Sequence, residues 1–406
     1  MKKHFLLIFA AVLCLMAPTA FAQSRIKLDK EHLNVSAGGR YNHILNGQDI
    51  YGRLVKTYGS GQGGFEVGLD THPSDSSWWA QAFNFPHLGL GFSYDHTGGL
   101  ASYEGSKLGD FYNLYGSLQF DFFRVETFSL GMNIDVGVAY TPERYHYFTN
   151  PGNVYIGSRI EAIIGAGLEA KWRFLPQWEI ALGGYLTHHS NGMTRVPNSG
   201  INQAGGGARL RYYLSAPEKY RKLDLAAPDF PRGWHWTVFA AAGVHSCDVE
   251  RMAMEKQMTE GERPYDDNST APARFRGILG TEAEWRYHRL LSTSIGLEGN
   301  YAVNDYRMMD RVLKGQEDPR GYSPFYVSVG ITQHLHFENF SLHVGWGAYV
   351  FRKTGLSEDM DWHFQRIGVR YLLPSFKTGR MYLGFDMRAH FLDRSYCLET
   401  TVGFKL

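Results

Sequence analysis

Short segments of alternating apolar and polar residues recur along most of this chain. In the segment 178–190, Trp178, Ile180, Leu182 and Leu186 alternate with smaller or more polar residues such as Glu179. Because successive side chains of a strand point to opposite faces, this pattern predicts a strand with one apolar and one polar face. About sixteen such segments can be counted, and the last alternates from Tyr396 to the final residue.

The connections between these segments alternate in length. Short turns are expected at 123–128, 175–178, 287–290 and 337–340, and long polar loops at 46–63, 141–157, 252–271 and 304–322. Transmembrane β-barrels have short periplasmic turns and long external loops. The segment 178–190 therefore runs outward, and its last residues lie at the external end.

Composition supports an all-β, transmembrane outer-membrane β-barrel. The chain holds 46 glycines, 25 tyrosines, 26 phenylalanines and 9 tryptophans, and its aromatic residues are spread over short alternating segments, as is typical of such barrels. No apolar run after residue 22 approaches the roughly 20 residues that a spanning helix needs. A soluble secreted β-sandwich is the alternative. The net charge of +1 gives no support to nucleic-acid binding.

Residues 1–22 have the features of an export signal. Lys2 and Lys3 precede the apolar stretch Leu6–Leu15, and Ala20-Phe21-Ala22 is a small-residue cleavage pattern. We therefore expect the mature chain to begin near Gln23 and to work outside the cytoplasm.

The two halves of the mature chain resemble each other. Residues 111–123 (FYNLYGSLQFDFF) match 325–337 (FYVSVGITQHLHF), and each segment is followed by a turn and Phe-Ser-Leu. A rival register pairs 169–174 with 282–287. The first register predicts two tandem eight-stranded units, residues 23–215 and 234–406, joined by a charged periplasmic linker at 216–233. One barrel of about 16 strands is the alternative.

Two cysteines of the mature chain discriminate between these architectures. Alternation places Cys247 and Cys397 on the lumen face, near the outer ends of the first and last strands of the second half. These strands pair in an eight-stranded barrel, whereas in one large barrel they would be farther apart than the roughly 7 Å that a disulfide can bridge. Two separate buried thiols are the alternative to a disulfide.

The strongest candidate for chemistry is a group of polar residues on the outward face. His188 and Ser190 share the face of Trp178 and Leu182, and Asn202 falls on the same face of the next strand if Arg209 and Arg211 point into the lumen. A histidine beside a serine can activate an oxygen nucleophile. Polar residues that merely lie at the headgroup level are the alternative. Zinc binding by His188 and His189 is not expected, since adjacent strand residues point to opposite faces.

The motifs HxSN at 188–191 and PNxGI at 197–201, with a polar residue at 202, resemble the lipid A 3-O-deacylase (PagL-type) family of outer-membrane hydrolases. The likeness extends over about residues 31–215. It implies an eight-stranded barrel whose external face carries a Ser/His/acid triad. That triad hydrolyses the ester-linked acyl chain at the 3-position of lipid A in the outer leaflet of the Gram-negative outer membrane.

The resemblance also implies roles for individual residues. Ser190 is the expected nucleophile and His188 the general base, and the oxyanion hole is expected from Asn191, Gly192 and Met193. The family has a glutamate where this chain has Asn202, whose carbonyl can still orient a histidine but adds no charge. A slower enzyme, or assistance from Glu143 of the external loop, is the hypothesis.

The second half does not repeat this pattern. His390 is followed two residues later by Leu392, and His390 is expected to point inward with Asp386, Arg388, Glu399 and Lys405 as a lumen charge network. We therefore expect one catalytic site, lipid A as the substrate and no metal or cofactor. A non-enzymatic porin or scaffold, and an outer-membrane phospholipase, are the alternatives.

Overall fold

The computed structural model describes residues 29–45, 47–48, 54–55, 59–73, 78–97, 105–225, 229–261, 273–303, 306–337, 339–357, 362–376, 379–390 and 394–406. The expected export signal, residues 1–22, lies outside these ranges. Within them, no helix is both long and apolar enough to span a bilayer. The chain forms two compact units. The first unit comprises the residues up to Asn191 together with Asn198–Pro228. The second unit comprises Gly192–Pro197 and Asp229–Leu406.

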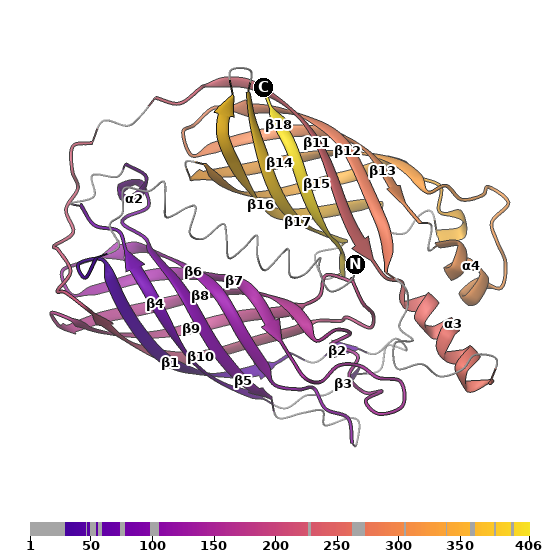
Figure 1. Ribbon diagram of the computed structural model, residues 1–406, viewed down its shortest axis with the longest axis horizontal. Helices are drawn as coiled ribbons and strands as arrows, with labels where there is room; N and C mark the ends of the chain where they lie inside the picture. Colours follow the sequence, from indigo (N-terminus) through magenta and orange to yellow (C-terminus); the bar gives the residue numbers. More distant parts are fainter. Residues whose placement is uncertain are drawn as a thin grey trace. The chain divides into compact units, whose positions relative to one another are not determined.

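The first unit contains a closed antiparallel barrel of eight strands (Figure 1). Its strands are β1 (Leu33–Ile44), β4 (Ser60–Asp70), β5 (His87–Thr97), β6 (Phe111–Arg124), β7 (Phe128–Tyr140), β8 (Ile160–Leu175), β9 (Trp178–Ser190) and β10 (Ile201–Tyr213). Each strand pairs with the next in sequence, and β1 closes the sheet by pairing with both β4 and β10. The short strands β2 (Gly47–Gln48) and β3 (Leu54–Val55) form a separate two-stranded sheet, and helix α2 (Trp78–Ala82) lies between β4 and β5.

The second unit contains another closed eight-stranded barrel. Its strands are β11 (Gly233–His245), β12 (Arg274–Arg286), β13 (Leu291–Ala302), β14 (Phe325–Phe337), β15 (Phe340–Phe351), β16 (His363–Phe376), β17 (Gly379–His390) and β18 (Arg394–Lys405). Helices α3 (Asp248–Thr259) and α4 (Tyr306–Lys314) and the short helix η2 (Gly355–Ser357) lie in its long connections. The predicted tandem of two eight-stranded barrels is confirmed, and the alternative of one large barrel is wrong.

The internal repeat has the register that the sequence favoured. The matched segments 111–123 and 325–337 are β6 and β14, each the fourth strand of its barrel, and β7 and β15 follow as the fifth strands. The rival match would have paired β8, a sixth strand, with β12, a second strand. The expected short turns also join β6 to β7, β8 to β9, β12 to β13 and β14 to β15.

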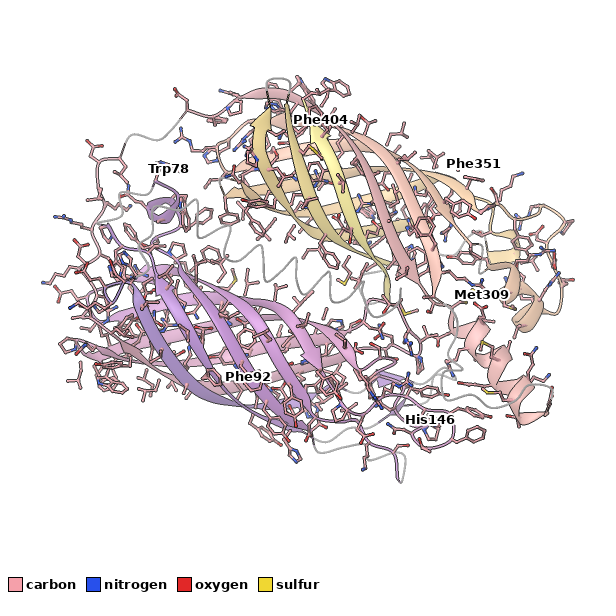
Figure 2. All side chains as sticks on the ribbon, viewed as in Figure 1. Trp78, Phe92, His146, Met309, Phe351 and Phe404 are labelled. Atoms are coloured by element: carbon pink, nitrogen blue, oxygen red, sulfur yellow. The ribbon has the colours of Figure 1, made fainter. Side chains whose placement is uncertain are left out.

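The outer wall of each barrel is apolar, as the alternation predicted. In β9, Leu182 is 58% and Leu186 62% exposed, whereas their neighbour Tyr185 is buried. Phe92 of β5, labelled in Figure 2, lies on the same outer surface with its ring against Phe65. These side chains would meet lipid in a membrane, where apolar contact costs nothing.

The lumen of the first barrel is filled by paired charges. Arg209 contacts Glu169 at 2.5 Å and Arg211 contacts Glu179 at 3.3 Å, which confirms the prediction that both arginines point inward. Two cavities of about 20 and 40 Å³ lie among the lumen-facing residues. Each has room for no more than a few water molecules.

The second lumen holds a denser network. Glu298 pairs with Arg366 at 2.6 Å and with Arg388 at 2.8 Å. Glu399 forms ion pairs with Arg388 and Arg276. Lys405 pairs with Glu284, and Asp386 pairs with His343. His390 is buried and lies 3.1 Å from the Tyr349 hydroxyl. The predicted inward charge network is therefore present, while Leu392 lies outside the described residues.

The closing seam of the second barrel accounts for the cysteines. Strand β11 pairs with β18, as predicted, with Val244 opposite Leu398. Both thiols are buried, and neither takes part in a disulfide. Cys247 lies near the outer end of the first strand of this barrel, as predicted, but two residues beyond it: β11 ends at His245, and Cys247 is the residue before α3.

Glu298→Gln should destabilise the second barrel. The substitution removes the charge shared by Arg366 and Arg388, and an uncompensated buried charge costs about 3–5 kcal/mol. Urea unfolding in detergent micelles, followed by tryptophan fluorescence, measures the loss. The control Glu317→Gln, at an exposed pair with Arg307, should leave the transition nearly unchanged. Equal transitions for both variants would contradict a stabilising role for the lumen network.

Candidate functional site

The site is built on the adjacent strands β9 and β10. His188 and Asn202 are directly opposite each other in the antiparallel register. The His188 Nδ1–H donates to Asn202 Oδ1 at 2.8 Å. This bond places the imidazole proton on Nδ1, so Nε2 is the nitrogen that can accept a proton.

Ser190 lies two residues along β9, on the same outward row as His188. Two residues of a strand span about 6.6 Å, so the two side chains are neighbours on one face. Ser190 is opposite Ala162 of β8 and is only 3% exposed. The outward position agrees with the predicted alternation, but the hydroxyl is covered rather than open to lipid.

Asn198 lies against this hydroxyl. Its Nδ2 donates to Ser190 Oγ at 2.8 Å, and its Oδ1 accepts the backbone N–H of Asn191 at 3.1 Å. Asn198 is not among the site residues predicted from the sequence, although its place in the PNxGI motif, eight residues after Ser190, was the available signal. A side chain in an irregular segment has no strand period from which its direction could be predicted.

The segment after Ser190 turns sharply. Gly192, Met193 and Gly200 all have positive φ, at 62°, 63° and 70°. Of the three expected oxyanion-hole residues, Asn191 gives its backbone N–H to Asn198, whereas Gly192 and Met193 form the left-handed part of the turn. Met193 adopts this conformation without being a glycine, which is uncommon for a non-glycine residue.

Gly200 fits closely against the imidazole of His188. A Cβ at this position would lie 2.7 Å from His188 Cε1 and 3.4 Å from Nε2. The Gly200 N–H donates to the Tyr155 carbonyl, and the Ser199 N–H donates to the Val154 carbonyl. Val154 and Tyr155 belong to an apolar cluster with Phe111 and Ile201. This cluster fixes the backbone that borders the histidine.

His189 points into the barrel, as predicted from the alternation. Its Nε2 lies 3.0 Å from Asn113 Oδ1, and its ring packs against that of Phe111, with the centroids 4.6 Å apart and the planes tilted by 35°. The two adjacent histidines therefore belong to opposite sides of the wall. Among the described residues, no cluster of three or more His, Cys, Asp or Glu side chains could hold a metal ion.

Glu143 was the carboxylate expected to assist the histidine. It instead lies beside Gly109 and pairs with Lys107 at 4.0 Å. The group that orients His188 is the neutral amide of Asn202. The arrangement is thus a serine and a histidine on the same row of β9, with an amide acceptor that holds Nδ1 of the histidine. Such a group can carry out nucleophilic acyl transfer.

Two family models match the chain. The model described as Lipid A 3-O-deacylase (PagL) matches residues 63–211, and the model described as Acyloxyacyl hydrolase, C-terminal domain, matches residues 234–406. The first match contains the site, and the second coincides with the second barrel. A search of curated proteins finds no match.

Comparison with solved structures finds other outer-membrane barrels. The outer membrane enzyme PagL is 17% identical, with 43% of this chain and 97% of that chain covered, at a TM-score of 0.29. Neisserial surface protein A is 10% identical, with coverages of 45% and 96%, at 0.29. OccAB1 of Acinetobacter baumannii is 9% identical, with coverages of 95% and 98%, at 0.26.

Gly200→Ala should slow the reaction of Ser190 with a fluorophosphonate probe by roughly 10- to 100-fold, because the added methyl would displace the imidazole. The positive φ of Gly200 adds backbone strain. The rate of covalent labelling, followed by mass spectrometry, measures the effect. Gly61→Ala is the matched control, since a Cβ there has no neighbour within 4 Å. Wild-type labelling of Gly200→Ala would show that the contact does not position His188.

Proposed function

We propose, since this chain belongs to the lipid A 3-O-deacylase (PagL) family, that it removes the ester-linked acyl chain at the 3-position of lipid A. The protein is an ester hydrolase of the Gram-negative outer membrane, and lipid A deacylation is the activity of its family. The position of the ester and the Ser-His mechanism are the parts that we propose here.

The observation that carries the proposal is the His188–Asn202 hydrogen bond on the outer wall, with Ser190 on the same row. A site on the outward face at the external end of a barrel meets lipid of the outer leaflet. The lumen is occupied by paired charges such as Arg209–Glu169, which argues against a porin that conducts solutes through the first barrel.

The proposed reaction has two steps. In the first, His188 Nε2 takes the proton of the Ser190 hydroxyl as Oγ attacks the ester carbonyl carbon. The tetrahedral intermediate collapses when the sugar oxygen leaves with that proton, and the acyl chain remains on Ser190. In the second step, His188 takes a proton from water, the resulting hydroxide attacks the acyl carbon, and the fatty acid leaves as Ser190 regains its proton.

The developing oxyanion needs hydrogen-bond donors. The amide of Asn198 already lies 2.8 Å from Ser190 Oγ, so it can reach an oxygen on the carbon that Oγ attacks. Backbone N–H groups of the turn after Ser190, including those of Gly192 and Met193, are the other donors that we propose.

Asn202 orients the base without charge. Its carbonyl holds the Nδ1–H of His188, which keeps Nε2 available, but it stabilises the imidazolium less than a carboxylate would. The second barrel lacks a matching serine and is proposed to have a structural or substrate-positioning role.

Ser190→Ala should abolish deacylation. Lipid A from cells that express the wild type should lose one hydroxyacyl chain by mass spectrometry, whereas lipid A from cells with the variant should keep it. Ser129→Ala is the matched control, because Ser129 is a buried serine of the same barrel on β7, and it should act like the wild type.

Two outcomes would contradict this proposal. Identical lipid A spectra with and without the wild-type protein would favour a non-enzymatic barrel. Intact lipid A together with newly cleaved glycerophospholipids would favour a phospholipase that uses the same serine.

Asn202→Glu should raise the deacylation rate constant by about tenfold, because a charged hydrogen bond to the imidazolium is stronger than a neutral one by about 1–2 kcal/mol. Asn202→Leu, which has a similar size and no acceptor, should lower the rate. Single-turnover kinetics on purified lipid A measure both. An unchanged or lower rate with glutamate would argue against the base-orienting role of Asn202.

A further inference from the structure

The turn that follows the proposed nucleophile belongs to the second compact unit. Residues Gly192–Pro197 are part of that unit, whereas Asn191 before them and Asn198 after them are part of the first. This segment, 192–197, is called the oxyanion turn below. It contains Gly192 and Met193, whose N–H groups are among the proposed oxyanion donors. The residues that hold it in place are therefore to be found in the second unit.

Ser246 holds the oxyanion turn by two hydrogen bonds. Its backbone N–H donates to the Met193 carbonyl at 2.7 Å, and its hydroxyl donates to the Thr194 carbonyl at 2.9 Å. Ser246 directly follows the last residue of β11 and is buried. Because peptide groups are planar, a residue that binds two successive carbonyl groups fixes the orientation of two successive peptide planes.

Leu398 of β18 borders the start of the turn. A Cβ at Gly192 would lie 2.4 Å from Leu398 Cγ and 2.7 Å from Cδ2, so a glycine is needed for the backbone to lie against this side chain. Leu398 shares the outward row of β18 with Val402, which is 44% exposed, but Leu398 itself is only 3% exposed. This part of the outer wall is thus covered rather than open to lipid, and Gly192 lies against it.

The conformation of the turn needs such support. Met193 has a φ of 63°, in the left-handed region that a non-glycine residue rarely occupies. Residues in this region keep their conformation only where the surrounding structure holds them. The hydrogen bond from Ser246 to the Met193 carbonyl is a contact of that kind.

We propose that Ser246 is a positioning residue for the oxyanion turn and that Leu398 supports the turn by packing. Together they keep the N–H groups of Gly192 and Met193 in the direction that the proposed oxyanion requires. The inference rests on the proposed function, since it assumes that Ser190 is the nucleophile. It gives the second unit a part in the reaction although that unit has no matching serine.

Ser246→Ala removes the hydroxyl bond to Thr194 and keeps the backbone bond to Met193. We expect kcat on purified lipid A to fall about tenfold with KM unchanged, because a loosened turn misplaces the donors that act in the transition state. Ser246→Thr keeps a hydroxyl and should stay within about threefold of the wild type. The rate constant for fluorophosphonate labelling should fall with kcat, since the phosphoryl oxygen takes the place of the oxyanion.

Ser294→Ala is the matched control. Ser294 is a buried serine of the same barrel, and its hydroxyl lies 2.9 Å from His334 Nε2. Its loss should leave kcat at the wild-type value. Heat-modifiable migration on gels reports whether each variant has folded. A folded Ser246→Ala protein with wild-type kcat, or an equal loss of kcat in folded Ser294→Ala, would overturn the proposal.

Leu398→Ala tests the packing contact separately. Removing this side chain leaves Gly192 without its neighbour, and kcat should fall at least threefold. Val402→Ala, on the same outward row, is the control and should keep the wild-type kcat. Equal kcat values for the two folded variants would overturn the role of Leu398.

Labelling of Ser190 by a fluorophosphonate separates this inference from the proposed substrate. If the wild type is labelled but leaves lipid A intact, the substrate is wrong, and the labelling rates of the same variants still test the role of Ser246. If the folded wild type is not labelled, Ser190 is not an activated nucleophile and the positioning role falls with it.

Discussion

Closure of each sheet by backbone hydrogen bonds is the constraint on which the rest of the structure depends. A bilayer offers no partners for free N–H and C=O groups, so a membrane sheet must have no open edge. Strand β1 closes the first barrel by pairing with both β4 and β10, and β11 closes the second by pairing with both β12 and β18. Once the wall is closed, every strand residue has only two environments, lumen or lipid. A polar side chain on the outer row is therefore unusual, because the other residues of that row are apolar and face lipid.

The same constraint decides what could be predicted from the sequence. Period-two alternation gives the face of a strand residue directly, and it placed His188, Asn202 and Arg209 correctly. The order of the repeats gave the number of strands per barrel, because one long match fixed β6 and β14 as equivalent strands. These features depend on local geometry and on order along the chain.

The parts that could not be predicted lie outside the strands. Ser190 accepts a hydrogen bond from Asn198, which lies in an irregular segment that contains several positive φ angles. The helix α3, which begins directly after Cys247, was not predicted from the sequence.

The neutral amide of Asn202 has a consequence for the medium in which the site works. The surface of a bacterial outer leaflet is crowded with phosphate groups and with the divalent cations that bridge them. A carboxylate at the rim of the wall would compete for those cations, whose preferred ligands are charged oxygens. An amide that holds His188 through its carbonyl oxygen is a much weaker ligand. The orientation of His188 therefore does not change with the calcium and magnesium concentration at the cell surface.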